Sequence, residues 1–455
     1  MLFFDQLTPG SVTYNAALAW RVEGPLDLGA LRDALTEVFR RQEALRTVLV
    51  WGEQATPSQV VLDEWSVELP VVDLSTVPEA DSDGELARQL ADHALRPFDL
   101  AAELMLRTTV FRLGPEEHAI LFAPHHVAFD AWAVEVLYRE VGELYAASLA
   151  GRAPQLPELG LQYRDFAAWQ RGHLQGERLQ GELDFWRTHL AGAPTVTQLP
   201  ADRPRGETEL FEGATHRFTL DADVAEGVRE LSASTGVTPY MLLLASFATL
   251  LYRASGQDDI LFGGPMANRE QPGLDHLIGF FANTIVVRVR MGANPTFGEL
   301  LARVRDSVLA SYEHQEVPLE LVVDAVRPER VPGVNPLFQV NFRVRVGDAP
   351  ALELEGARTL PLPVDLGHAR FELALELHVL EDRIEAELNY NVALFDATTV
   401  VRMAGDLEAL LRTVLAEPDT RLLGVTLASE QAAPDGQGSP TGGRSAIRSF
   451  RRAGG

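Results

Sequence analysis

Apolar residues recur along the chain with two periods, one typical of amphipathic helices and one typical of half-buried strands. The first clear helix is predicted after Asp27, a suitable N-cap, because an apolar helical face follows at Leu28, Leu31, Leu35 and Val38. Residues 104–113 are rich in β-branched and aromatic side chains, and residues 119–123 form a second apolar run, so both are predicted as strands. Since helical and strand patterns alternate throughout, the sequence predicts a mixed α/β fold.

Two stretches rich in proline and glycine divide this pattern, residues 151–160 and residues 192–208. We place a boundary near residues 175–205 and predict an N-terminal lobe over 1–180 and a C-terminal lobe over 181–430. In the second lobe the pattern predicts helices at 239–252, 296–312 and 397–415, strands at 259–262, 284–290 and 337–345, and alternating strands between 370 and 391. Gly, Pro and Ser dominate the remainder, so residues 431–455 are predicted to form a disordered tail.

Composition and charge exclude several classes of function. The 455 residues carry a formal net charge of −26, and such an acidic surface repels phosphate backbones and anionic membranes, so we expect neither as a partner. There are no cysteines, which excludes disulfides, cysteine-ligated metals and a thiol nucleophile, and which fits the cytoplasmic location that we expect. The longest apolar stretch, Tyr240 to Tyr252, is too short to cross a bilayer, and the N-terminus lacks the basic region of a signal peptide.

The strongest local signal for chemistry is the string His125-His126-Val127-Ala128-Phe129-Asp130, between the end of a predicted strand and a predicted helix. A sheet fixes side chains at such a place while the loop leaves them accessible. Neutral imidazole can accept a proton near neutral pH, so the pair indicates acid–base chemistry, although the string alone would also fit two structural histidines. Asp130 is too near His126 in sequence to be assumed its direct partner, and it could equally anchor the loop through an arginine.

This string resembles the His-His-x-x-x-Asp-Gly signature of the condensation domains of non-ribosomal peptide synthetases, part of the chloramphenicol-acetyltransferase-like superfamily. Further blocks resemble the same family and occur in family order: Arg41-Gln42-Glu43-Ala44-Leu45-Arg46-Thr47, Tyr163-Arg164-Asp165-Phe166-Ala167-Ala168-Trp169, Gly264-Pro265-Met266-Ala267-Asn268-Arg269, Ile278-Gly279-Phe280-Phe281-Ala282-Asn283-Thr284 with Arg288, His314 to Glu320, and Arg330 to Gln339. Any single block would be weak, whereas the ordered set, spanning roughly residues 2–428, resembles one free-standing domain of that family.

The resemblance implies a V-shaped pair of chloramphenicol-acetyltransferase-like lobes with a central tunnel. Phosphopantetheine arms of carrier proteins would enter from opposite ends with a donor thioester and an acceptor amine, so we expect the chain itself to bind no cofactor and no metal. By motif, His126 is the expected catalytic residue, either as the base that takes the amine proton or as the group that hydrogen-bonds and positions the amine. His125 and Asp130 are expected to be structural, with Asp130 paired to Arg288.

Four residues are candidates for the tunnel wall by the same resemblance: Ala131, Trp132, Asn283 and Asn335, although the two asparagines would serve equally well as loop anchors. Two positions depart from the family pattern. Ala131 replaces a glycine, and alanine costs little there only if φ is negative, because positive φ favours glycine. Gln42 replaces a histidine and is expected to be a tolerated structural change.

We expect the chain to act as a monomer on peptidyl or acyl carrier proteins, or on other synthetase modules, in trans, because it has no room for a carrier or adenylation domain. A small untethered acceptor is also compatible with the sequence. Two alternative functions stay open. An alcohol acceptor would give an ester in place of an amide. Alternatively, the domain is a non-catalytic scaffold that binds a carrier protein and recruits a tailoring enzyme, which Ala131 and the absence of the family's usual first block favour.

Overall fold

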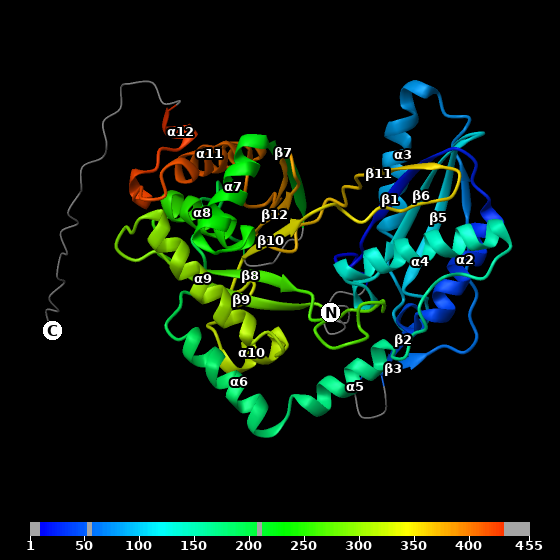
Figure 1. Cartoon of the computed structure of the whole chain (residues 1–455), viewed down its shortest axis with the longest axis horizontal. Helices are drawn as coiled ribbons and strands as arrows, with labels where there is room; N and C mark the ends of the chain where they lie inside the picture. Colours follow the sequence, from blue (N-terminus) through cyan, green and yellow to red (C-terminus); the bar gives the residue numbers. More distant parts are fainter. Residues whose placement is uncertain (1–9, 52–56, 207–211, 432–455) are drawn as a thin grey trace, which may run out of the picture.

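The computed structural model describes residues 10–51, 57–206 and 212–431, which form two lobes built on separate sheets (Figure 1). Helices cover both sheets, so the prediction of a mixed α/β chain with two lobes is confirmed. The predicted tail falls outside the described residues from position 432 onward.

The sheet of the N-terminal lobe has the order β11 (Arg358–Leu362), β1 (Leu18–Glu23), β6 (Glu117–Pro124), β5 (Leu106–Gly114) and β4 (Val71–Asp73). Neighbouring strands are antiparallel except β4 and β5, which are parallel. The strands predicted at 104–113 and 119–123 are confirmed as β5 and β6. A separate antiparallel pair is formed by β2 (Thr47–Trp51) and β3 (Pro57–Val61).

Helices pack on both faces of this sheet. The first, α2 (Leu28–Arg41), begins where predicted, because the Asp27 side chain accepts a hydrogen bond from the Ala30 N–H at 2.9 Å. Its buried residues share a core with α4 (Ala131–Ala150), whereas α3 (Glu79–Ala94) contributes Leu86 and Leu90 to a core on the other face. The turn that connects β6 to α4 therefore lies between two well-packed elements.

The sheet of the C-terminal lobe has the order β7 (Gly213–Leu220), β13 (Ile384–Asn391), β12 (Leu373–Val379), β10 (Val340–Val346), β8 (Asp259–Met266) and β9 (Asn283–Arg290). The central strand β10 runs parallel to both of its neighbours. Five helices adjoin this sheet: α7 (Ala222–Thr235), α8 (Pro239–Ser255), α9 (Phe297–Glu313), α10 (Leu319–Val326) and α11 (Ala397–Ala416). A short 3-10 turn, η3 (Leu422–Gly424), and α12 (Ala428–Gln431) complete the lobe.

The predicted helices at 239–252, 296–312 and 397–415 are confirmed as α8, α9 and α11. Every residue from Met241 to Leu251 of α8 is buried, which agrees with its unbroken apolar sequence. No single helix in the described ranges is long and apolar enough to cross a bilayer. Only α7 and α8 together have that length and composition, and they are bent by 109°.

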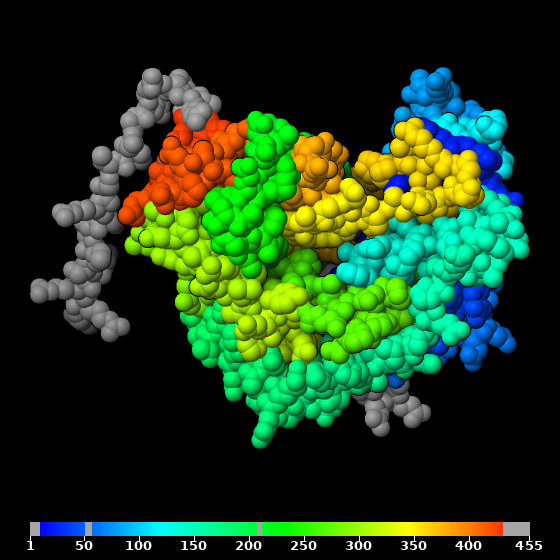
Figure 2. All heavy atoms as spheres, in the orientation of Figure 1, coloured from blue at the N-terminus to red at the C-terminus, as the bar shows by residue number. Residues whose placement is uncertain are grey.

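Two parts of the chain connect the lobes. The segment between β10 and β11 crosses from the C-terminal lobe to complete the N-terminal sheet, so a late strand belongs to the early sheet (Figures 1 and 2). At the opposite side, α5 (Tyr163–His173) and α6 (Gly176–His189) lead from one lobe to the other (Figure 1). The space-filling view shows a notch between the lobes above the crossing segment, which is coloured yellow (Figure 2).

Gln42 provides a buried polar link between the lobes. It follows α2 and precedes a 3-10 turn, η1 (Glu43–Arg46), and it is completely buried. Its Nε2 donates to Glu140 Oε1 and to the carbonyl oxygen of His276, both at 2.9 Å, while its Oε1 accepts from the Ile278 N–H at 2.8 Å. The glutamine therefore uses both of its N–H groups and its oxygen, which agrees with its expected structural role.

Candidate functional site

The turn after β6 is fixed by main-chain hydrogen bonds before any side chain is considered. The N–H of His125 donates to the carbonyl oxygen of Met105, and the N–H of His126 donates to that of Tyr14, both at 2.9 Å. A 3-10 turn, η2 (His126–Ala128), then leads to Phe129 and the first turn of α4. The sequence prediction that the two histidines lie between a strand end and a helix is confirmed.

The ring of His126 has a defined tautomer. Its Nδ1 lies 2.9 Å from the carbonyl oxygen of Phe129, and a carbonyl oxygen only accepts hydrogen bonds, so Nδ1 carries the hydrogen. In a neutral ring, Nε2 then holds a free lone pair. The residue is half-buried, lines a cavity between the lobes and meets the ring of Phe280 edge-on at 6.2 Å. Nε2 is therefore the atom that can accept a proton or a hydrogen bond from a ligand.

The surroundings of His126 keep the ring neutral. Burial, followed by the positive charge of Arg370, lowers its pKa to about 3, even though the hydrogen bond to Phe129 partly opposes these effects. Arg370 is held close to the same turn, because its Nε donates to the carbonyl oxygen of Thr13 at 2.9 Å and its guanidinium lies over the ring of Tyr14. At neutral pH the imidazole is consequently uncharged and can accept a hydrogen bond at Nε2.

His125 has a different environment. Its side chain is 4% exposed and packs against the rings of Phe98 and Tyr14. Its Nδ1 accepts a hydrogen bond from the Val127 N–H at 3.1 Å, which closes the turn. Burial, together with the smaller effect of the Arg370 charge, lowers the pKa of His125 to about 4. The ring stabilises the turn that carries His126 and does not line the cavity.

Asp130 joins the two lobes through its carboxylate. Oδ1 accepts from the Ala133 N–H at 2.9 Å and thereby caps α4, while Oδ2 accepts from the N–H groups of Phe281 and Ala282 at 3.0 and 3.2 Å. Arg269 completes the set, with Nη2 at 3.0 Å from Oδ1, and both side chains are 2% exposed. The aspartate is thus a fully hydrogen-bonded structural anchor beside the histidine turn.

The predicted pairing of Asp130 with Arg288 is wrong. Arg288 lies on β9, where its Nη2 is 2.7 Å from Asp259 of β8 and its Nη1 donates to the carbonyl oxygens of His189 and Ala191. The antiparallel register places Arg288 opposite Leu261, two residues from Asp259, so the two charged residues lie on the same face of the sheet. Arg288 therefore stabilises the C-terminal lobe itself and does not contact the histidine turn.

Ala131 occupies the first position of α4 without backbone strain. Among the described non-glycine residues, positive φ occurs only at Asn268, Asn294, Arg327 and Leu337, so position 131 does not demand glycine. The alanine is exposed and lines the cavity, as does Trp132, whose Nε1 donates to the carbonyl oxygen of Asp275 at 3.1 Å. Both residues therefore lie where the resemblance placed them.

Of the two roles left open for the asparagines, the structure favours the loop anchor for Asn283. Asn283 donates from Nδ2 to the carbonyl oxygens of Gln315 and Val317, and its Oδ1 accepts from the N–H groups of Thr284 and Leu319. Because both its N–H groups and its oxygen are hydrogen-bonded to the main chain, Asn283 anchors the loop and does not line the cavity. Asn335 donates to the carbonyl oxygen of Arg370 at 3.2 Å and lines a separate cavity of about 230 Å³ in the C-terminal lobe.

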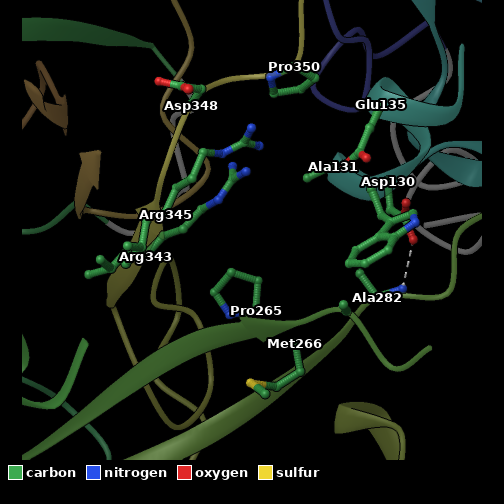
Figure 3. Close-up of a pocket in the computed structure, with 14 residues that line it drawn as sticks. Asp130, Ala131, Glu135, Pro265, Met266, Ala282, Arg343, Arg345, Asp348 and Pro350 are labelled. Atoms are coloured by element: carbon green, nitrogen blue, oxygen red, sulfur yellow. Dashed lines mark hydrogen bonds between the residues drawn. The ribbon is translucent and has the colours of Figure 1, made fainter. Parts of the chain in front are cut away.

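Two connected cavities lie between α4 and β10. One, of about 590 Å³, is lined by residues of α4, the end of β8, β10 and the segment after it (Figure 3). The other, of about 490 Å³, contains His126 and Phe129. They share five residues, Asp130, Ala131, Arg343, Arg345 and Pro350. The histidine therefore faces a space that continues past the start of α4 between the lobes.

Sequence reasoning missed the arginines that face this space. Arg343 and Arg345 lie on β10, where a Val-Asn-Phe-Arg-Val-Arg-Val pattern alternates polar and apolar residues. Alternation with a period of two places both arginines on one face of a strand, so the sequence alone could have predicted that they lie side by side. Arg370 had no comparable signal, because its position near Tyr14 depends on how the lobes meet. No group of three or more potential metal ligands occurs among the described residues.

Comparisons with known proteins agree with this geometry. The sequence matches the condensation-domain family over residues 1–434. It is 40% identical over 424 residues to phosphinothricin tripeptide synthetase PhsC of Streptomyces viridochromogenes, covering 92% of this chain and 39% of that protein. The chain spans well under two thirds of the length of the first curated relatives that it matches.

Solved structures give the same fold. The X-domain from teicoplanin biosynthesis superimposes with a TM-score of 0.83 at 31% identity, over 92% of this chain and 94% of that one. An X-domain from the same biosynthesis, in a complex with OxyB, superimposes with a TM-score of 0.82 at 32% identity, over 92% of each chain. The predicted chloramphenicol-acetyltransferase-like architecture is thereby confirmed.

Proposed function

Because the chain belongs to the condensation-domain family, we propose that it transfers an acyl or aminoacyl group from a carrier-bound phosphopantetheine thioester to an acceptor amine. The observation that carries the proposal is the state of His126. Its Nδ1–H donates to the carbonyl oxygen of Phe129, which leaves the Nε2 lone pair free, and the residue lines the cavity between the lobes. The proposed partners are therefore carrier proteins whose phosphopantetheine arms deliver the substrates.

The proposed reaction forms a C–N bond and breaks a C–S bond. The amine nitrogen attacks the thioester carbonyl carbon while one of its N–H groups donates a hydrogen bond to Nε2 of His126. The tetrahedral intermediate transfers that proton to Nε2, and its collapse expels the phosphopantetheine thiolate, which takes the proton back. The products are an amide and a free thiol, and the histidine returns to its neutral form.

The low pKa of His126 determines when the proton moves. An imidazole whose pKa lies near 3 is a weak base for a neutral amine, so its first role is to accept a hydrogen bond and orient the nucleophile. The nitrogen becomes acidic once it has attacked the carbonyl carbon, and the proton transfers at that stage. Holding two tethered substrates in line can contribute about 7–11 kcal/mol, more than a positioned base, so the walls of the cavity matter as much as the histidine.

The proposal is tested by intact-protein mass spectrometry. A carrier protein loaded with a panel of acyl groups is mixed with amine acceptors and with the wild-type chain, the His126→Ala variant or the His216→Ala variant. His216 lies on β7, outside the two cavities, and serves as a matched control. Transfer by the wild type and the control that is about 10²- to 10⁴-fold slower with His126→Ala supports a condensing enzyme. An alcohol arm identifies ester formation, since Nε2 would accept a hydrogen bond from an O–H equally well.

A second candidate function is a scaffold that recruits another protein. It is favoured by the likeness to an X-domain that was solved in a complex with OxyB. Against it stands a cavity with a neutral histidine whose Nε2 is free to accept a hydrogen bond. If carrier proteins bind but no acyl group moves with any donor and acceptor, the scaffold function replaces the condensing one.

A further inference from the structure

Strand β10 directs two arginines into the space between the lobes. Arg343 and Arg345 lie two residues apart on the same face of the strand, and both line the two cavities that meet at Ala131. Figure 3 shows their side chains running next to each other across the larger cavity toward the start of α4. Two like charges at neighbouring half-buried positions repel each other, so an anion placed between them would be stabilised.

The two arginines differ in their partners. Arg343 Nη1 lies 3.2 Å from Oε1 of Glu376, so its charge is matched within the strand pair β10 and β12. Arg345 makes no hydrogen bond and no ion pair with any residue that the structure describes. Burial and the neighbouring charge of Arg343 lower the pKa of its guanidinium, and the carboxylates of Glu376 and Glu135 only partly oppose this shift. Within the described residues the Arg345 guanidinium therefore lines both cavities without a hydrogen-bonding partner of its own.

The remaining charges of the cavity orient a ligand. Glu135 on α4 faces the guanidinium groups from the opposite wall, whereas Asp348 points away from them (Figure 3). Asp130 is already occupied by Arg269. The larger cavity is thus positive on its β10 wall and negative on its α4 wall, so a ligand with both charges would turn its anionic group toward Arg345 there. The smaller cavity also contains Glu376, Glu385 and Glu387 and is less suited to an anion.

We propose that Arg345, with Arg343 beside it, binds an anionic group on the substrate that reacts in this cavity. The proposal rests on the proposed acyl transfer and names its substrate class as an acidic amino acid or a similarly acidic acyl group. A guanidinium matches a carboxylate through two parallel N–H···O bonds, which a neutral amide of the same shape cannot reproduce. The site therefore selects charge in preference to size.

Binding tests the site without requiring turnover. Aspartyl and asparaginyl amides of aminopantetheine differ only in the charge of the side chain, and neither carries a phosphate that could compete for the arginines. By calorimetry the wild type should bind the aspartyl compound about 10- to 100-fold more tightly, the range expected for hydrogen bonds to charged groups. Arg345→Gln should reduce this ratio to near one. Arg290→Gln, at a residue of β9 whose side chain is 60% exposed, should preserve it.

Turnover separates this inference from the proposed function. The same pair of side chains is offered once on the acceptor and once on the donor, and the ratio of kcat/KM for the acidic and the amide substrate is measured. A charge preference in either arm that Arg345→Gln removes supports the site. Transfer without any charge preference, in binding or in turnover, overturns it while the acyl transfer stands. Tight, Arg345-dependent binding of the aspartyl compound without transfer retains the site and rejects the proposed function.

Discussion

Asp130 lies 3.0 Å from Arg269, and this buried pair, in which both side chains are 2% exposed, joins the start of α4 to the loop after β8. Removing one partner leaves an uncompensated buried charge, so Asp130→Asn and Arg269→Gln should each lower the free energy of unfolding by about 3–5 kcal/mol. A double-mutant cycle in chemical denaturation checks the pairing. The coupling energy should be about 1–3 kcal/mol for Asp130 with Arg269.

The same cycle with Arg288 is the matched control. Arg288 is paired with Asp259, so its effect should add to that of Asp130→Asn within about 0.5 kcal/mol. A strong coupling between Asp130 and Arg288, with none to Arg269, would contradict the arrangement described here.

The two histidines of the turn should make the free energy of unfolding depend on pH. Both have pKa values lowered by burial, to about 4 for His125 and about 3 for His126, whereas an unfolded histidine titrates near 6.5. Below that value the unfolded chain binds protons that the folded turn does not. Their contribution is therefore complete above pH 6.5 and is lost as pH falls toward 4, by about 1.4 kcal/mol per pH unit for each histidine.

Carboxylates also titrate at low pH, so the measurement compares variants. Denaturation of the wild type and of His126→Asn is followed between pH 7 and pH 4.5. The stability of the variant should fall less steeply with acid than that of the wild type. Equal slopes would mean that the folded ring titrates normally, and the cause given for its neutrality would be wrong.

Truncation of the Gln42 side chain should destabilise the fold. Its side chain makes three hydrogen bonds at complete burial, to Glu140, to the carbonyl oxygen of His276 and from the Ile278 N–H. Gln42→Ala leaves the carbonyl oxygen of His276 and the Ile278 N–H without this partner, while Glu140 keeps its hydrogen bonds from Arg41, and should lower the free energy of unfolding by about 3 kcal/mol. Gln59→Ala, at an exposed position of β3, is the control and should change it by less than about 0.5 kcal/mol. A near-neutral Gln42→Ala would show that the lobes do not depend on this link.

Ala131 should not be a strained residue. Because its φ is not positive, Ala131→Gly relieves nothing, and the added freedom of the unfolded chain should lower stability by about 0.5 kcal/mol. Thermal unfolding of the two proteins checks this sign. A variant that is more stable than the wild type would reveal strain at the start of α4 and would strengthen the scaffold alternative.

The order of helices and strands could largely be predicted from the sequence, because α2, α4, α8 and α11 have long apolar stripes or runs that leave little ambiguity. Elements such as β7 and α10 were not predicted. Strand β7 has only one fully buried residue and no clear alternation of polar and apolar residues. Helix α10 has only eight residues, too few for a clear helical period. The sequence also did not predict that β11 joins the N-terminal sheet. Its partner β1 lies more than 200 residues earlier in the chain, so this pairing depends on how the two lobes assemble.

In the candidate site, too, the sequence predicted the residues that are contiguous in the chain and missed the contacts between distant segments. The turn with His125, His126 and Asp130 was apparent, because its residues are contiguous and lie between a predicted strand and helix. The partner of Asp130 was assigned wrongly, because Arg269, Arg288 and Arg290 all follow β8 in sequence and only the fold shows which of them reaches Asp130. Arg370, which lowers the pKa of His126, comes from 244 positions later in the chain, and no local pattern connects the two.

If this chain catalyses acyl transfer through His126, replacement of that histidine must slow the transfer. The mass of an acceptor is followed over time with acyl-loaded carrier protein and either wild-type chain or His126→Ala, after both are shown to unfold at similar temperatures. The expected result is a gain of the acyl mass that slows by about 10²- to 10⁴-fold in the variant. Carrier protein that binds without any transfer of mass, or transfer at equal rates by both proteins, would contradict the claim.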